Sequence, residues 1–190
     1  MKHAASRELF AYWEERRGAR PAPERADIEP GAIRAALSDT FILELTDAAD
    51  SHAFRLAGTR VCALFGRELK GESFVDLWAA ASRGPIADLL AISTEENVGT
   101  VAGVTAQSTD GDPIELELLL LPLGIRRPRL SRTIGILAPL TRPAWLGAHP
   151  IGALTLGSRR HVGETTTKIR LLPRFMAPRR GLVVHQGGRS

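Results

Sequence analysis

The apolar residues near the start of this chain follow the period of a helix. Large side chains recur on one face of the segment, at Leu9, Tyr12, Trp13 and Arg16. This spacing predicts a helix over residues 6–17, capped by Ser6 and ended by Gly18. The aromatic side chains need a surface to cover them, either the domain's own sheet or a second subunit. Leu9, Tyr12 and Trp13 are therefore candidate contacts for a homodimer or a partner.

The period of the pattern then changes from that of a helix to that of a strand. Prolines at positions 21, 23 and 30 predict an irregular connector over residues 19–31. A short helical turn is expected at residues 32–37. The β-branched and apolar runs at 40–45 and 52–58 predict two strands joined by a polar turn. In the second strand, Phe54 and Leu56 are expected on one face, with Arg55 on the other.

Short helices are predicted after these two strands. Thr59 is placed to cap a helix over residues 60–65, and Gly66 to close it. Another short helical piece follows Ser73. A longer helix is expected from Pro85 to about Asn97, because a proline is tolerated in the first helical turn.

The next segment has the pattern of antiparallel strands. Asp110-Gly111 is a strong hairpin signal between strands at 99–109 and 113–121. A last strand is expected at 132–140. The order of two strands, short helices and three strands predicts an α+β fold over residues 32–140. Its core is a five-stranded antiparallel sheet with short helices on one face, preceded by the helix and connector of residues 1–31.

Charge is unevenly distributed along the chain. Residues 141–190 carry nine Lys or Arg residues and a single acidic residue, Glu164, so their net charge is +8. Because the net charge of the whole chain is +4, residues 1–140 have a net charge of −4. We expect this basic tail to be flexible. The alternative is that its arginines bind nucleic acid or an acidic partner.

Several stretches of the sequence resemble the PAS family. They are FRLAGTRVCALFGRELKGESFVDLW (54–78), LELLLLPL (116–123), GILAPL (135–140) and the opening YWEERRGARPAPERADIEP (12–30). Together they are similar to a bacterial subfamily of small stand-alone PAS proteins, over about residues 9–140. The resemblance implies a sensory or regulatory role in bacterial signal transduction, through ligand occupancy, dimerisation or contact with a signalling protein.

A PAS-like layout leaves a space between helices and sheet that either holds a ligand or is filled by side chains. Apolar residues predicted to face this space are Phe65, Phe74, Trp78, Leu89, Leu90, Val104 and Leu118. Arg55 and Arg60 lie near the predicted helix entry and are able to hold a carboxylate bidentately. A small hydrophobic ligand or a small carboxylate is therefore expected if the space is open. Surface ion pairs, such as Arg67 with Glu68 or Glu72, are the alternative for such arginines.

The identity of any cofactor is left open by the sequence. Photoactive flavin binding in PAS proteins uses an asparagine-cysteine-arginine stretch, and Cys62 lacks those neighbours. Haem binding commonly uses a histidine on the helix predicted at 85–97, which has none. Both readings are disfavoured. His52 is expected to face solvent, Cys62 to pack as a small apolar group, and the histidines show no metal-ligand spacing.

Enzyme chemistry is not favoured by the polar residues. Glu115 and Glu117 share one face of a strand, and their alternation with leucines predicts a solvated face rather than a catalytic pair. No glycine-rich phosphate loop is present, and no catalytic or metal residue is assigned. A small-molecule enzyme remains the least favoured alternative. No apolar run reaches the length of a membrane helix, and we expect a cytoplasmic protein.

Overall fold

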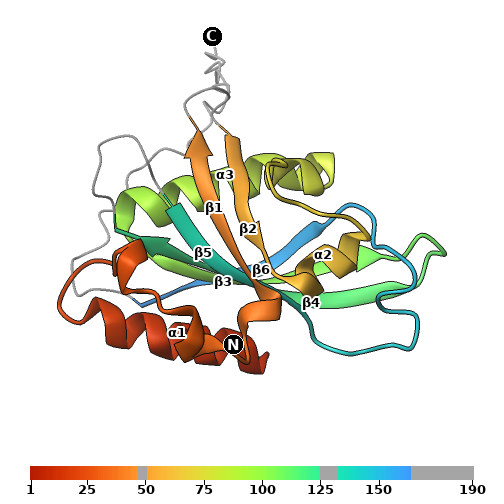
Figure 1. Ribbon diagram of the computed structural model, residues 1–190. Helices are drawn as coiled ribbons and strands as arrows, with labels where there is room; N and C mark the ends of the chain where they lie inside the picture. Colours follow the sequence, from red (N-terminus) through yellow and green to blue (C-terminus); the bar gives the residue numbers. More distant parts are fainter. Residues whose placement is uncertain (47–50, 125–131, 164–190) are drawn as a thin grey trace, which may run out of the picture.

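The computed structural model describes residues 1–46, 51–124 and 132–163. In this part of the chain, six strands form one antiparallel sheet in the order β2-β1-β5-β4-β3-β6 (Figure 1). The strands are β1 (Thr40–Thr46), β2 (Ser51–Ala57), β3 (Gly99–Gln107), β4 (Pro113–Leu123), β5 (Arg132–Pro139) and β6 (Thr155–Val162). The fold is α+β and PAS-like, as expected, with one strand more than the sequence predicts.

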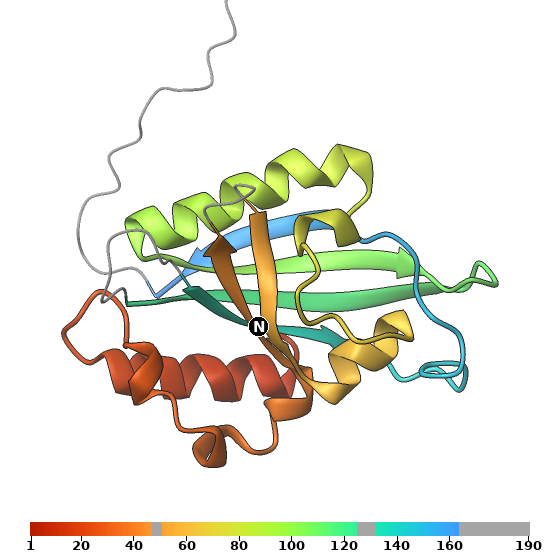
Figure 2. The same ribbon diagram turned by 45° about the horizontal axis from the view of Figure 1, so that its top comes forward.

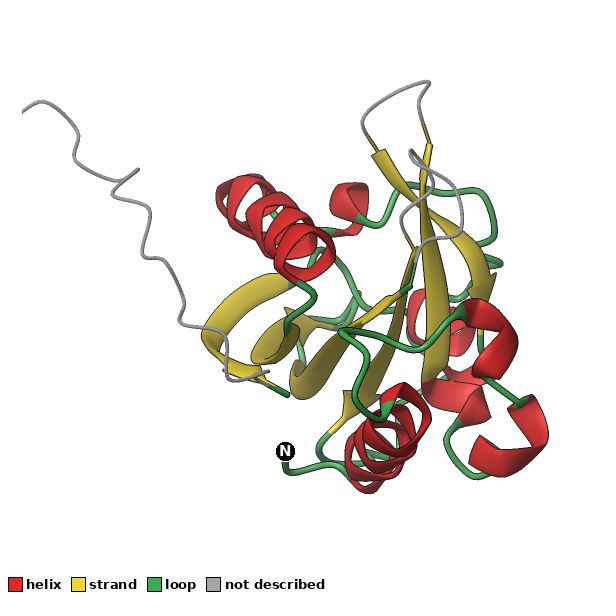
Figure 3. Ribbon diagram, turned by 90° about the vertical axis from the view of Figure 1, so that its left-hand side faces the viewer, coloured by secondary structure: helices red, strands yellow, loops and turns green. Residues whose placement is uncertain are grey.

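Helices cover both faces of the sheet (Figures 2 and 3). The α-helices are α1 (Ala4–Arg17), α2 (Thr59–Phe65) and α3 (Ala80–Glu96). Short 3-10 helices lie at Arg25–Asp27, Pro30–Ile33, Leu37–Asp39 and Val75–Leu77. α2 and α3 pack on one face, called the inner face here. α1 and the connector after it pack on the opposite, outer face.

The two covered faces explain the leucine run in β4. Leu116, Leu118 and Leu120 belong to the inner core, whereas Leu119 and Leu121 belong to the outer core. Successive strand residues point to opposite faces, so a strand covered on both sides is apolar at nearly every position.

The inner core contains a chain of aromatic rings. Phe41 stacks on Phe74 with ring centroids 5.3 Å apart, and Phe74 meets Trp78 edge-on at 5.7 Å. Gly135 lies opposite Phe41 in the sheet, and a Cβ built on it would stand 2.4 Å from Cζ of that ring. Glycine at position 135 therefore makes room for the aromatic chain.

A β-bulge lies between Phe54 and Leu56, the two large apolar residues of β2. Ile42 pairs with Leu56 but the next residue, Leu43, pairs with Phe54, so Arg55 is the extra residue. Such an insertion reverses the alternation of faces. Phe54 is buried, whereas 45% of Leu56 is exposed. The expectation that these two side chains share a face was wrong for this reason.

The segment expected to be a flexible tail contains β6. This strand pairs with β3, and the residues before it are tied to the helices by Ile151 N donating to Leu64 O and Leu154 N donating to Leu77 O. The expectation of flexibility is therefore wrong for residues 141–163. Residues 164–190 lie outside the described part of the chain.

All three α-helix starts differ from the sequence prediction. Thr59 was expected to cap the helix over residues 60–65, but it is the first residue of α2 and Gly58 is the cap. α1 is capped by His3, whose Nδ1 accepts from the Ala5 backbone N–H, and not by Ser6, which is buried. α3 begins at Ala80 and takes Pro85 into its second turn. Its end matches the prediction, because Asn97 adopts the left-handed conformation that terminates helices.

Candidate functional site

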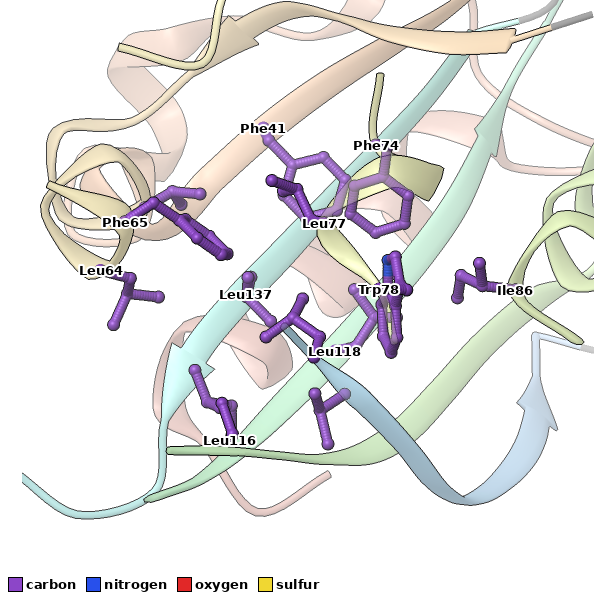
Figure 4. Packing of buried hydrophobic residues seen from close by; sticks show 14 of the residues in the cluster. Phe41, Leu64, Phe65, Phe74, Leu77, Trp78, Ile86, Leu116, Leu118 and Leu137 are labelled. Atoms are coloured by element: carbon purple, nitrogen blue, oxygen red, sulfur yellow. The ribbon is translucent and has the colours of Figure 1, made fainter. Parts of the chain in front are cut away.

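The predicted ligand-lining residues come together in the inner core. Each is 5% exposed or less, and all belong to one continuous cluster: Phe65, Phe74, Trp78, Leu89, Leu90, Val104 and Leu118. Figure 4 shows several of them facing one another from α2, β4 and the segment before α3. Three surface pockets among the described residues are lined by other side chains. In this structure the seven residues pack against one another as core.

One polar atom in this core stands out. Trp78 is fully buried, and among the described residues its indole N–H has no hydrogen-bond partner. A buried donor without a partner costs about 1–3 kcal/mol. Trp78 is thus the one of the seven that offers a polar contact to a molecule in the core.

The two candidate arginines pair with different carboxylates of the chain itself. Arg60 holds Asp39 bidentately, with Nε to Oδ1 at 2.7 Å and Nη2 to Oδ2 at 2.5 Å. This hydrogen bonding to Asp39 raises the pKa of Arg60. Arg55 is exposed and lies 3.6 Å from Glu44, which Arg132 approaches more closely. Arg55 and Arg60 are therefore not brought together on one carboxylate of the chain, and a ligand carboxylate held by them stays a prediction.

The candidate partner residues of α1 are buried within the chain. Leu9 and Trp13 are fully buried and Tyr12 is 8% exposed, all against the outer face of the sheet. The Trp13 indole N–H donates to the Pro122 carbonyl at 2.8 Å. The Tyr12 hydroxyl donates to the Asp27 carbonyl and accepts from a backbone N–H of the connector. Of the two surfaces left open by the sequence, α1 covers its own sheet, so these side chains do not face a second subunit here.

Glu117 is buried, contrary to its expected place on a solvated face. Its carboxylate accepts backbone N–H groups from Lys2 at 2.6 Å and His3 at 3.0 Å, while Glu115 is exposed. Burial favours a higher pKa, but these N–H donors and the N-terminal amine outweigh it and hold the pKa of Glu117 below its ordinary value. Glu117 therefore fastens the start of the chain to β4.

Neither Cys62 nor His52 forms a reactive centre in the described residues. Burial raises the pKa of the Cys62 thiol, which lowers the fraction of reactive thiolate. His52 is buried and not solvent-facing as expected, because the segment from Gly71 to Phe74 lies along β2. Within the described ranges, no three His, Cys, Asp or Glu side chains gather to hold a metal ion. No helix in those ranges is both long and apolar enough to cross a membrane.

Two pockets on the surface of the described residues were not expected from the sequence. The first, called the Leu56 groove, has a volume of about 380 Å³ and lies between the outer face of β1 and β2 and the connector. Its apolar walls include Ile28, Ile33, Leu37, Ile42, Leu56 and Ile134. The second, called the Arg142 pocket, has about 230 Å³ and lies between α2 and the loop after β5. Both need segments far apart in sequence, so no local motif marks them.

A comparison with models of protein families places the chain in a family. A family model described as a PAS domain matches residues 1–138. A search among curated proteins returns no match. A solved structure described as an RNA-binding light-oxygen-voltage receptor is 19% identical, with a TM-score of 0.44, over 63% of this chain and 36% of that one. From the family match, the chain belongs to the PAS domain family, whose members are typically sensory or regulatory domains and not enzymes.

Proposed function

We propose that this PAS domain regulates a partner protein by binding it non-covalently through the Leu56 groove. The observation that carries the proposal is the exposure of Leu56 at the wall of an apolar groove. Among the described residues, Leu56 is the only large apolar side chain classed as exposed. A single exposed leucine is ordinary, but one that borders a groove of this size offers an anchoring point for a partner.

The groove favours side-chain docking over the addition of a strand. The edge of β2 beside the groove is already paired: Phe54 N donates to Glu72 O, and Gly71 N donates to Phe54 O. The face of the sheet, not this edge, is therefore open to a partner. Of the residues that the structure describes, Arg25 lines the groove and no acidic side chain does. This charge balance favours a partner segment with apolar anchors and a nearby carboxylate.

Site-specific crosslinking tests the proposal. A photoreactive amino acid replaces Leu56 in one variant and exposed Gln107, on β3 away from the groove, in a control variant. We expect one protein to be captured from position 56 and not from position 107. That protein, once purified, should bind Leu56→Asp at least about tenfold more weakly than the wild type, as loss of an interface anchor does. Gln107→Asp should bind like the wild type.

Equal binding of the purified partner by wild type and Leu56→Asp would refute the groove as its docking site. Capture from both positions would point to non-specific contact. Circular dichroism of both variants checks that the fold is retained.

A second candidate function is the sensing of a small molecule within the inner core. The unpartnered indole N–H of Trp78 supports it, since a ligand acceptor there would remove the penalty of a buried free donor. We expect native mass spectrometry of the purified chain to show a retained molecule that Trp78→Phe loses. A ligand-free mass for the wild type, together with an unchanged melting temperature on addition of cell extract metabolites, contradicts this candidate.

A further inference from the structure

The Arg142 pocket joins parts of the chain that are far apart in sequence. α2 forms one wall, and the loop after β5 forms the other, close beside it in Figures 1 and 2. The backbone hydrogen bond from Ile151 N to Leu64 O, 2.7 Å long, holds the end of this loop against α2. The pocket shares no lining residue with the Leu56 groove, and it borders the inner core at Leu64.

Positive charge in this pocket is only partly neutralised. Arg60 uses Nε and Nη2 to hold Asp39, and its Nη1 has no partner among the described residues. Arg142 lines the same pocket and makes no ion pair or hydrogen bond with the described part of the chain. Two guanidinium groups therefore face one carboxylate, and one positive charge is left over.

Apart from His3, the rest of the lining is apolar or backbone. Leu64 comes from α2, and Pro143 and Leu146 come from the loop. An uncompensated guanidinium beside an apolar wall suits a ligand that carries both a carboxylate and a hydrocarbon body, because a guanidinium binds a carboxylate bidentately. A volume of about 230 Å³ corresponds to roughly eight water-sized groups.

We propose that the Arg142 pocket binds a small monocarboxylate with an apolar body. Arg142 and the free Nη1 of Arg60 hold the carboxylate, and Leu64 and Leu146 contact the hydrocarbon part. Asp39 keeps the Arg60 side chain in place and partly lowers the positive charge, which favours a singly charged ligand over a more highly charged one.

Binding of hexanoate to the full-length chain tests this site. The matched neutral probe is hexanamide, which has nearly the same size and shape. We expect saturable binding of hexanoate by titration calorimetry, and at least about tenfold weaker binding of hexanamide, because the charge-assisted hydrogen bonds are lost. In NMR spectra, hexanoate should shift the amide signals of Leu64 and Gly147.

Two arginine variants test whether hexanoate binding requires the positive charge of Arg142. Arg142→Gln should weaken hexanoate binding by at least about tenfold. Arg67→Gln is the control, because Arg67 is an exposed arginine near the end of α2 that pairs with Glu72 outside the pocket; its binding should stay within about twofold of the wild type. Both variants lie on the surface and should keep the wild-type melting temperature.

Three results would overturn the proposal. One is the absence of saturable hexanoate binding, and another is equal binding of hexanoate and hexanamide. The third is a set of amide shifts centred on Trp78, which would place the carboxylate in the inner core. Loss of the Leu56 partner interaction has no bearing on these outcomes, so this site and the proposed docking function are tested separately.

Discussion

The Glu117 carboxylate links two distant parts of the sequence through two backbone hydrogen bonds. Its contacts to Lys2 and His3 place the first residues of the chain on β4 and thereby set where α1 begins. Because α1 supplies Leu9 and Trp13 to the outer core, this contact also helps to seal that core.

The stability that Glu117 provides should depend on pH. Its pKa in the folded chain lies below the ordinary value of 4.5, so the carboxylate stabilises the fold fully above that value. This stabilisation is lost as the pH falls through the folded pKa. We expect Glu117→Gln to melt at a lower temperature than the wild type at pH 7, with a cost of about 1–3 kcal/mol. The difference should shrink below about pH 4.

Glu115→Gln is the control for this prediction, because Glu115 is exposed on the same strand. Its melting temperature should follow that of the wild type across the pH range. A gap between wild type and Glu117→Gln that stays constant from pH 7 to pH 3 would show that the carboxylate charge is not responsible.

At the scale of elements, local signals in the sequence predicted most helices and strands. Gly66 and Asn97 end helices as expected, since each adopts the left-handed conformation that their residue types permit. The hairpin at Asp110-Gly111 joins β3 and β4 as its turn chemistry predicts. The sequence also predicted the aromatic face of α1. It left open whether the chain's own sheet or a second subunit covers that face.

The features that were missed depend on long-range pairing. β6 is polar along most of its length and solvent-exposed at Gly157, Ser158 and Arg159, so it lacks the alternation that marks a half-buried strand. Its partner is β3, and the paired residues are fifty or more positions apart in the sequence. The bulge at Arg55 and the burial of Glu117 likewise depend on neighbouring segments. The Leu56 groove and the Arg142 pocket follow from these same long-range contacts.

At the scale of the whole molecule, β6 and the residues before it complete both the sheet and the inner core. Ile151 and Leu154 are buried in that core. A chain truncated after residue 163 keeps these contacts, whereas one truncated after residue 141 loses them and leaves β3 as an unpaired edge.

We therefore expect the 1–163 chain to melt close to the full-length protein. The 1–141 chain should melt lower by at least about 5 °C, because burial of large aliphatic side chains is lost. Differential scanning calorimetry on the three chains measures this directly. Equal melting temperatures for 1–141 and full length would mean that β6 adds nothing to the stability of the sheet.

The position of β6 also affects how two copies of the molecule associate at high protein concentration. Without β6, the edge strand of the sheet would be β3. Its apolar residues Val101, Ala102 and Val104 favour pairing with an edge strand of another molecule. With β6 in place, the edge strand carries Arg159 and Arg160, both exposed. When the β6 edges of two molecules approach each other, their arginine side chains repel. An exposed arginine pair on an edge strand is one of the features that disfavour edge-to-edge aggregation.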